Sequence, residues 1–162
     1  MLDRTDFKIL ELLQCDGRIA NSKLAELVSL SPTAVISRVQ KLTKEGYILG
    51  YEAKLNPNKL DAGFVVFVEV MLDKTTPNAL EEFEEAILDY PEISECHLMS
   101  GGFDFLLKVR SANMEEFRKM AGQVLWQLPG VKETRSYPVM EELKTTTRLK
   151  LKSKTAVKNK GA

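Results

Sequence analysis

One group of residues with the types and spacing needed for chemistry lies in the first third of the chain. The stretch from Pro32 to about Glu45 predicts a helix with an apolar stripe formed by Val35, Val39 and Leu42. A helix about 10–12 Å across fits a DNA major groove about 12 Å wide, and small side chains allow close approach to base edges. On the side away from the stripe, the candidates for contacting DNA are Ala34, Ser37, Arg38 and Lys41.

A second group surrounds a Gly101-Gly102 turn and could hold a free amino acid. Asp104 could accept hydrogen bonds from the ligand ammonium, and the glycine N–H groups could donate to the ligand carboxylate. The apolar wall for the ligand side chain would be Leu98, Met114 and Val139. A glycine pair that only turns a hairpin, beside a solvated Asp104, would leave the same pattern. The residues alone therefore do not decide between a binding site and a plain turn.

Short helices are expected to position the first group. Asp3 and Asp6 predict a helix start, Asp16-Gly17 predicts its end, and Asn21 predicts the cap of a second helix of barely two turns. Ser31-Pro32 then supplies a capping hydroxyl and a proline at the first position of the third helix. This order predicts a helix-turn-helix, although a purely structural three-helix bundle has the same pattern.

After the third helix, Gly46 acts as a stop and residues 48–55 alternate between apolar and polar side chains. The alternation predicts a small two-stranded wing. Together with the helices it predicts a winged helix-turn-helix as the N-terminal domain.

A second domain is expected to position the glycine turn. Its predicted order is strand 64–72, helix 78–90, strand 93–100, strand 103–110, helix 117–128 and strand 131–140. This is the ferredoxin-like βαββαβ pattern, in which both helices cover one face of an antiparallel sheet, so the fold class is α+β. The strand 64–72 is apolar on both faces, and we expect a second copy of the chain to cover the other one.

Composition excludes several function classes. The 162 residues are 44% hydrophobic and 28% charged, with one histidine, His97, and two cysteines, Cys15 and Cys96. These residues are too few for a metal cluster, no nucleophile is paired with a base, and no phosphate-binding loop is present. We therefore expect no catalytic residues, no metal and no cofactor, and we expect both cysteines to be buried thiols. With no membrane span or signal region, we expect a cytoplasmic protein.

The formal net charge of zero conceals three differently charged segments. Residues 1–55 carry +1, residues 56–142 carry −8, and residues 143–162 carry +7. The basic end can hold a polyanion by releasing counterions, or it can be a solubilising terminus. It lacks apolar spacing, so disorder is predicted for residues 152–162.

Several short motifs point to one family. They are Leu2-Asp3-Arg4, Asp16-Gly17-Arg18, Leu30-Ser31-Pro32-Thr33, Arg38-Val39, Gly46-Tyr47-Ile48, Gly50-Tyr51, Leu55-Asn56-Pro57, Glu95-Cys96-His97-Leu98, Leu128-Pro129-Gly130-Val131 and Met140-Glu141-Glu142. From about residue 2 to residue 151, the chain resembles the Lrp/AsnC, or feast/famine, transcription regulators. The resemblance implies a DNA-binding domain over residues 1–55, a linker over 56–62 and an effector-binding and oligomerisation domain over 63–151.

The resemblance also implies partners and site residues. It adds Ser31, Pro32 and Thr33 to the DNA-contacting set, and it implies dimers that assemble into octamers or related discs with an amino acid between dimers. The implied effector site is Leu98, Gly101, Gly102, Phe103, Asp104, Met114, Tyr137, Pro138 and Val139. Gly102 and Pro138 depart from the family's usual residues.

The predicted function is therefore sequence-specific binding of double-stranded DNA by a transcription regulator that responds to a small amino acid, with leucine or methionine favoured. The alternative is an amino-acid-binding regulatory module without direct DNA contact. An enzyme on the ferredoxin-like fold is the weaker rival, because the fold alone decides no chemistry.

Overall fold

The computed structural model describes residues 1–73, 75 and 77–151, so the predicted disorder of residues 152–162 lies outside the described residues. The described chain forms two compact units. The first comprises Met1–Ala53 together with residues 145–151, and the second comprises Lys54–Lys144. In the described part, no helix is long and apolar enough to cross a membrane.

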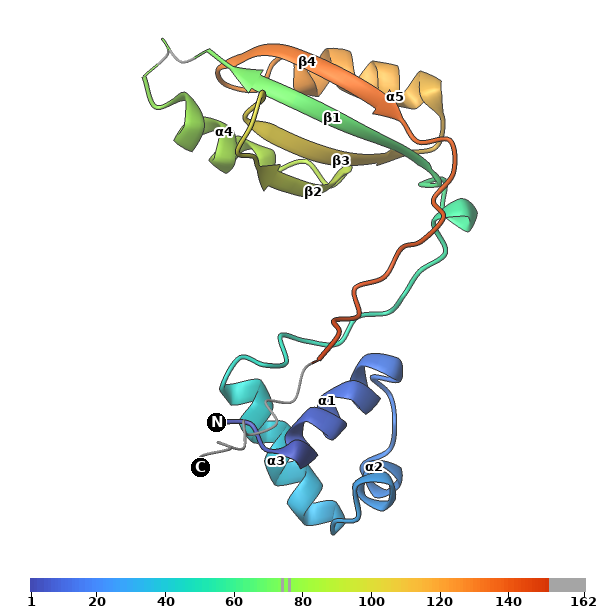
Figure 1. Ribbon diagram of the computed structural model, residues 1–162. Helices are drawn as coiled ribbons and strands as arrows, with labels where there is room; N and C mark the ends of the chain where they lie inside the picture. The colour runs from blue at the N-terminus through green and yellow to red at the C-terminus, as the bar shows by residue number, and fades with distance from the viewer. Residues whose placement is uncertain (74, 76, 152–162) are drawn as a thin grey trace, which may run out of the picture. The chain divides into compact units, whose positions relative to one another are not determined.

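The first unit contains the three predicted helices, which are α1 (Arg4–Cys15), α2 (Asn21–Val28) and α3 (Pro32–Lys44) (Figure 1). Their inward faces form one small core of Ile9, Leu24, Ala25, Val35 and Leu42. The apolar spacing of each helix accounts for this core, since residues three and four apart share a helix face. The helix-turn-helix is thus assembled from α2 and α3.

The ends of these helices follow the local signals in the sequence, with one exception. Asp3 and Asp6 form a reciprocal capping box at the start of α1, and the Ser31 hydroxyl accepts a hydrogen bond from the Ala34 N–H at the start of α3. Gly46, with φ of 75°, follows α3 in the left-handed region. Asn21 is not the cap that the sequence predicted: it is the first helical residue of α2, whose cap Ala20 makes no side-chain hydrogen bond.

The predicted two-stranded wing is not formed as strands. Residues 48–55 contain no strand, although the Ile48 N–H donates to the Leu42 carbonyl and Ile48 packs on the helical core. Every side chain from 49 to 55 is exposed. The alternation in the sequence therefore has no apolar surface to pack on in this unit, and an isolated two-stranded ribbon is only marginally stable.

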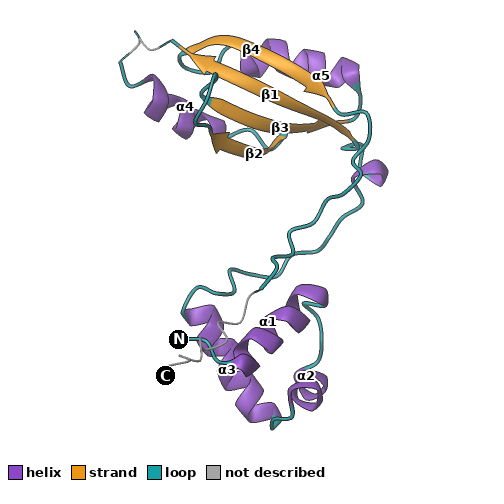
Figure 2. Cartoon of the chain, viewed as in Figure 1, coloured by secondary structure: helices purple, strands orange, loops and turns teal. Residues whose placement is uncertain are grey.

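The second unit has the predicted βαββαβ order (Figure 2). Its elements are β1 (Phe64–Leu72), α4 (Ala79–Ile87), β2 (Ile93–Leu98), β3 (Phe105–Ser111), α5 (Met114–Met120) and β4 (Val131–Pro138). A 3-10 turn (Pro57–Lys59) precedes β1, and a π-helical turn (Ala121–Leu125) continues α5. The sheet order is β2-β3-β1-β4, with every neighbouring pair antiparallel. The ferredoxin-like prediction is confirmed.

Both helices cover the same face of the sheet, as predicted (Figure 1). Val66, Val68 and Val70 of β1 are completely buried in this core, and the rings of Phe83 and Phe105 stack with centroids 4.5 Å apart. Gly130 in the turn before β4 has φ of 68°, and a Cβ there would lie 2.6 Å from the Ala79 Cβ. The Pro129-Gly130 turn can therefore pack against the start of α4 only because residue 130 is glycine.

No helix of the described residues lies over the opposite face of the sheet. Phe67, Glu69 and Met71 of β1 point to this face and are half-buried, and Leu106 of β3 lies beside Glu69 in the register. We call this surface the open face. It is the face for which the sequence predicted a covering second copy.

Two further local predictions are wrong. Cys15 and Cys96 are both free thiols at exposed positions rather than buried ones, because Cys15 ends α1 and Cys96 lies on the edge strand β2. The strand predicted from Phe103 begins at Phe105, since residues 101–104 form a succession of bends.

Candidate functional site

The outward face of α3 is the first candidate site. Thr33, Ser37, Gln40 and Lys44 are exposed and lie on one side of the helix, together with Ile36. At roughly 100° per residue, this side is opposite the buried residues Val35 and Leu42. It presents hydroxyl, amide and ammonium groups, which can donate to base edges and phosphates.

The predicted DNA-contacting residues fall around this face, but not all at its centre. Ser31, Pro32, Thr33, Ser37 and Lys41 are exposed, whereas Ala34 and Arg38 are half-buried on one flank. The sequence reasoning missed Ile36, Gln40 and Lys44. The sequence contained the information needed to find Gln40 and Lys44. The helix side opposite the buried stripe is centred near Thr33 and Ser37 and includes both residues.

Arg38 makes an ion-pair cluster inside the first unit. Its Nη1 donates to Asp3 Oδ2 over 2.6 Å and to Asp6 Oδ1 over 2.7 Å. The same two carboxylates form the capping box of α1, so Arg38 links the middle of α3 to the start of α1. The pKa of the Asp3 carboxyl is lowered, mainly by the hydrogen bond that it accepts from the Asp6 N–H and next by Arg38. In turn, Asp3 and Asp6 raise the pKa of the Arg38 guanidinium.

The Gly101–Asp104 turn lines a cavity of about 340 Å³ at one end of the sheet. Asp104 is fixed there by its backbone and its side chain: its N–H donates to the Val70 carbonyl, and its Oδ2 accepts from the Leu72 N–H over 2.8 Å. The cavity is lined by Met71, Leu72, Asp73, Thr75, Gly101, Gly102, Phe103, Asp104 and Lys132. Leu98 lies close by at the end of β2, paired with Phe105.

Lys132 is a cavity residue that the sequence reasoning missed. It follows Val131, which pairs with Leu72 in the sheet register, so β4 brings it to the turn from 28 residues further along the chain. The cavity thus has a carboxylate from Asp104 and an ammonium from Lys132. Those two groups complement the two charges of a free amino acid.

The remaining predicted effector residues lie at the other end of the same sheet. Tyr137 and Pro138 pair with Phe67 and Val66 near the start of β1, whereas the glycine turn lies beside the end of that strand, at Val70 and Leu72. Met114 begins α5, which directly follows the end of β3. Within one chain, the structure therefore does not bring Met114, Tyr137, Pro138 and Val139 together with the glycine turn.

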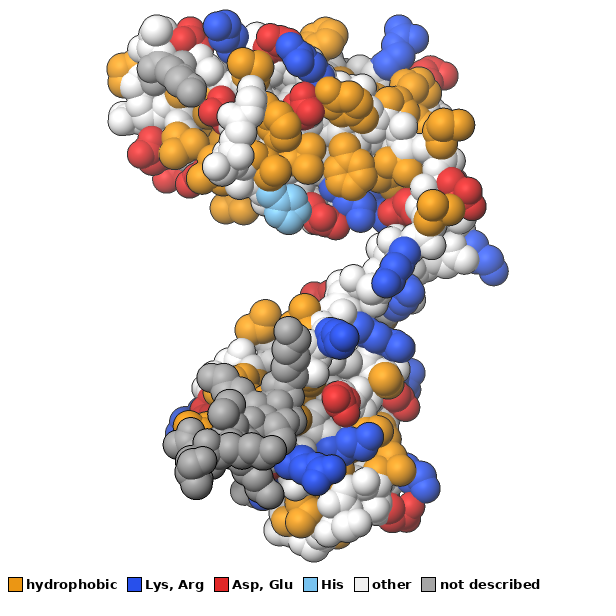
Figure 3. Space-filling model, viewed as in Figure 1, with side chains coloured by type: hydrophobic (Ala, Val, Ile, Leu, Met, Phe, Trp, Pro, Cys, Tyr) orange, Lys and Arg blue, Asp and Glu red, His pale blue; other side chains and the backbone are white. Residues whose placement is uncertain are grey.

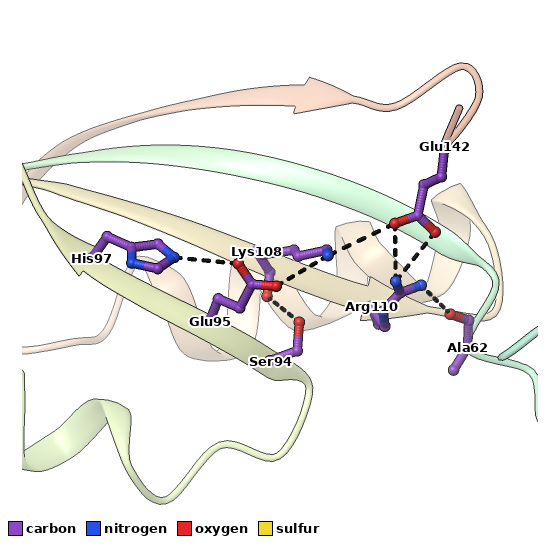
Figure 4. A network of polar contacts seen from close by, with 7 residues as sticks. All are labelled: Ala62, Ser94, Glu95, His97, Lys108, Arg110 and Glu142. Atoms are coloured by element: carbon purple, nitrogen blue, oxygen red, sulfur yellow. Dashed lines mark hydrogen bonds and ion pairs between the residues drawn. The ribbon is translucent and has the colours of Figure 1, made fainter. Parts of the chain in front are cut away.

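A polar network crosses the open face beside its apolar residues (Figures 3 and 4). Lys108 is 11% exposed and lies between two carboxylates, with its Nζ 3.1 Å from Glu95 Oε1 and 3.7 Å from Glu142 Oε1. Glu95 also contacts His97 Nε2 over 3.2 Å. The pKa of the Glu95 carboxyl is lowered, mainly by the hydrogen bond from Lys108 and to a smaller extent by His97. Arg110 Nη2 donates to both carboxylate oxygens of Glu142, over 3.0 and 3.1 Å.

Tyr137 lies on the same face and donates its hydroxyl to Glu69 Oε2 over 3.1 Å, which raises the pKa of the phenol. Phe67 pairs with both Lys108 and Tyr137, so an aromatic side chain stands between the two polar clusters. An apolar strip flanked by satisfied charges is a typical protein–protein surface.

A helix-turn-helix joined to a ferredoxin-like domain with a charged cavity defines a DNA-binding transcription regulator with a small-molecule-binding domain. Residues 2–48 match the winged helix-turn-helix DNA-binding family, and residues 65–149 match the Lrp/AsnC ligand binding domain. The chain belongs to the Lrp/AsnC family. The family resemblance and the predicted regulator function are confirmed, and the reading without DNA contact, like the enzyme reading, is not supported.

Individual relatives agree along nearly the whole chain. The leucine-responsive regulatory proteins of Klebsiella pneumoniae and Escherichia coli K12 are each 50% identical over 153 residues, covering 94% of this chain and 93% of the relative. A transcriptional regulator from Neisseria meningitidis, solved in complex with L-Met, superposes with a TM-score of 0.88 at 34% identity, covering 93% of this chain and 97% of that one. An AsnC family transcriptional regulator from Agrobacterium tumefaciens superposes with a TM-score of 0.87 at 32% identity. The match covers 92% of this chain and 97% of that one.

Proposed function

We propose that this regulator changes its assembly and its DNA binding in response to a small apolar amino acid, with leucine or methionine favoured. The observation that carries the proposal is the cavity shared by Asp104 and Lys132. A free amino acid could present its ammonium to Asp104 and its carboxylate to Lys132. The N–H groups of Gly101 and Gly102 offer further donors to that carboxylate.

The choice of amino acid is supported by two relatives. Proteins 50% identical to this chain are named leucine-responsive, and the Neisseria regulator was solved with L-Met. On this chain, the apolar cavity residues Met71, Leu72 and Phe103 supply surface for such a side chain. Burying it is favourable by about 25 cal/mol per Å² of apolar area.

We propose further that the effector site is completed by a second copy of the chain. The two groups of predicted effector residues lie at opposite ends of one sheet, so a single ligand can meet both only if they come from different copies. The site then includes Leu98, Gly101, Gly102, Phe103 and Asp104 of one copy and Met114, Tyr137, Pro138 and Val139 of another. A ligand held between copies prefers one assembly over another, which is the condition for shifting an equilibrium.

The assembly that we propose begins with a dimer through the open face. Phe67, Met71 and Leu106 would be buried there against a second copy, as homodimers commonly bury an apolar face on both subunits. We further propose, with family membership as the support, that these dimers assemble into octamers or related discs. The cytoplasm, which holds the DNA of a bacterial cell, is the proposed location.

For DNA, we propose that the exposed residues Thr33, Ser37 and Gln40 meet base edges. Ser31, Pro32 and Ala34 allow close approach at the start of α3, and Arg38 and Lys41 contact phosphates from its flank. The positions of these side chains on α3 support this division. Phosphate contacts would set the register on DNA, and base contacts would set the sequence preference.

The decisive experiment is capture of genomic DNA fragments by the full chain, with and without leucine or methionine, and with glutamate as the matched amino acid of the wrong polarity. We expect a defined set of fragments whose capture changes with leucine or methionine and not with glutamate. Capture of the same fragments under all conditions would contradict the effector proposal while leaving DNA binding intact.

A further inference from the structure

One large apolar side chain stands among the polar groups on the outward side of α3. Ile36 is 39% exposed and lies outside the buried core of the three helices. Its neighbours on the helix surface, three residues before and four residues after, are Thr33 and Gln40, and both are exposed. A single exposed apolar residue is common on protein surfaces, so the place of Ile36 on this face matters more than its exposure.

The two flanks of the outward face carry different chemistry. At roughly 100° per residue, Lys41 lies toward one flank, and Ile36 lies toward the other, together with Pro32. A helix in the major groove presents both flanks to the DNA. The flank with Lys41 carries an ammonium that suits a phosphate. The flank with Pro32 and Ile36 is apolar and suits an apolar group of the groove.

The edges of the base pairs offer one apolar group in the major groove, which is the C5-methyl of thymine; the other groups there are hydrogen-bond donors and acceptors. An isoleucine pressed against the donors and acceptors of a G·C pair would remove water from them without replacing its hydrogen bonds, which costs free energy. In a helix, isoleucine also strongly prefers one χ1 rotamer, so ordering Ile36 on contact costs little entropy. Its chemistry therefore favours thymine.

We propose that Ile36 is a specificity-determining residue that contacts the C5-methyl of thymine in the major groove. The inference rests on the proposed reading of bases by the outward face of α3. It adds an apolar contact to the hydrogen bonds that Thr33, Ser37 and Gln40 can make there. The contact selects A·T pairs over G·C pairs at the positions that Ile36 meets.

The test is the affinity of the full chain for one captured fragment, synthesised once with thymine and once with deoxyuridine at every thymine position. Uracil keeps the major-groove acceptor of thymine and lacks its methyl. Wild type should bind the uracil fragment about 4-fold more weakly for each methyl that Ile36 covers, which corresponds to about 0.8 kcal/mol. Ile36→Ala should bind the thymine fragment more weakly and show a correspondingly smaller ratio of the two dissociation constants. Ile36→Val should keep part of the ratio.

Leu27→Ala is the matched control, because Leu27 is an exposed apolar residue of α2, 46% exposed, and its loss should leave the wild-type ratio unchanged. A helical signal equal to that of wild type in circular dichroism is expected for all three variants. An equal uracil-to-thymine ratio in wild type and Ile36→Ala would overturn the inference, since a residue that only packs within the protein does not sense a DNA methyl group.

Gln40→Ala separates that failure from a failure of the proposed function. If Gln40→Ala weakens binding while the ratio stays equal in wild type and Ile36→Ala, the assignment of Ile36 is wrong and base reading by α3 stands. If Gln40→Ala and Ile36→Ala both leave the affinity unchanged, the outward face of α3 does not read bases, and the inference falls with it.

Discussion

The DNA-reading face and the effector site differ in how much of each one chain contains. The outward face of α3 is complete on a single helix, where Thr33, Ser37 and Gln40 lie side by side. The proposed effector residues are divided between two ends of a sheet, with Asp104 at one end and Tyr137 at the other. The first site can exist in a monomer, whereas the second, as we propose it, requires assembly.

This difference couples the two functions. A ligand that needs two copies reports on assembly, and assembly decides how many helix-turn-helix units can meet one DNA molecule at the same time. Linked binding units gain affinity through effective concentration without any new contact. An amino acid can therefore regulate DNA binding without touching α3, provided that it prefers one assembly.

The largest expected effect comes from breaking the proposed dimer. Phe67→Glu places a carboxylate at the centre of the open face, beside Glu69 and opposite its own copy in a symmetric dimer. Burying an unpaired charge costs several kcal/mol, so the dimer dissociation constant should rise by more than about 100-fold. Analytical ultracentrifugation of the full chain measures this change.

The matched control is Leu88→Glu. Leu88 is the C-cap residue directly after α4, on the covered side of the sheet, and is 83% exposed, so the same charge there should leave the dimer intact. Equal dissociation constants for Phe67→Glu and the wild type would show that the open face is not the dimer surface. Loss of folding in Phe67→Glu, read by circular dichroism, is not expected, because Phe67 lies outside the helix-covered core.

The next largest effect separates the two roles of Asp104. Asp104→Asn keeps an acceptor for the Leu72 N–H but removes the charge, so leucine or methionine affinity should fall about 10- to 100-fold with little change in stability. Asp104→Ala also leaves that N–H without its acceptor, and should lower the free energy of unfolding by about 1–3 kcal/mol. Calorimetry and urea unfolding measure the two quantities.

Lys132→Gln provides the complementary variant at the same cavity. If it weakens the binding of leucine as Asp104→Asn does, both charges of the ligand are recognised there. Undiminished leucine binding in both variants would place the effector elsewhere. Neither variant should alter the dimer dissociation constant, because both residues lie at the end of the sheet.

The sequence predicted what depends on local spacing. The three helices, the βαββαβ order and the strand Phe64–Leu72 were recovered, because 3.6- and 2-residue periods and capping residues act over a few positions. The winged helix-turn-helix class was predicted correctly, but the strands expected in residues 48–55 and the burial of the two cysteines were wrong. Alternation and residue type do not say whether another surface is available to pack on. Lys132 and the Gln14–Leu149 contact were missed because they join residues far apart in the chain.

Arg38 pairs with Asp3 and Asp6 and is also a proposed phosphate contact, so it gives a test within the DNA-binding unit. Arg38→Ala removes the ion pairs to Asp3 and Asp6, so it should lower the free energy of unfolding by about 1–2 kcal/mol, since the pairs are partly exposed. Gln40→Ala should lower affinity for specific DNA by about 10-fold or more while stability stays within about 0.5 kcal/mol. Equal stability of the two variants would contradict this division of roles.

The smallest expected effect is the pH dependence of that ion-pair cluster. The pKa of Asp3 is lowered in the folded chain, so its contribution to stability is present above the unfolded value of about 3.9 and is lost as pH falls through the folded pKa. The stability difference between wild type and Arg38→Ala should therefore be full at pH 7 and shrink below about pH 4. Lys23→Ala, which breaks the fully exposed pair with Glu26, should change stability little at either pH. Urea unfolding at pH 7 and pH 3 measures both differences, and a difference for Arg38→Ala that stays constant would mean that the Asp3 carboxylate does not hold α3 against α1.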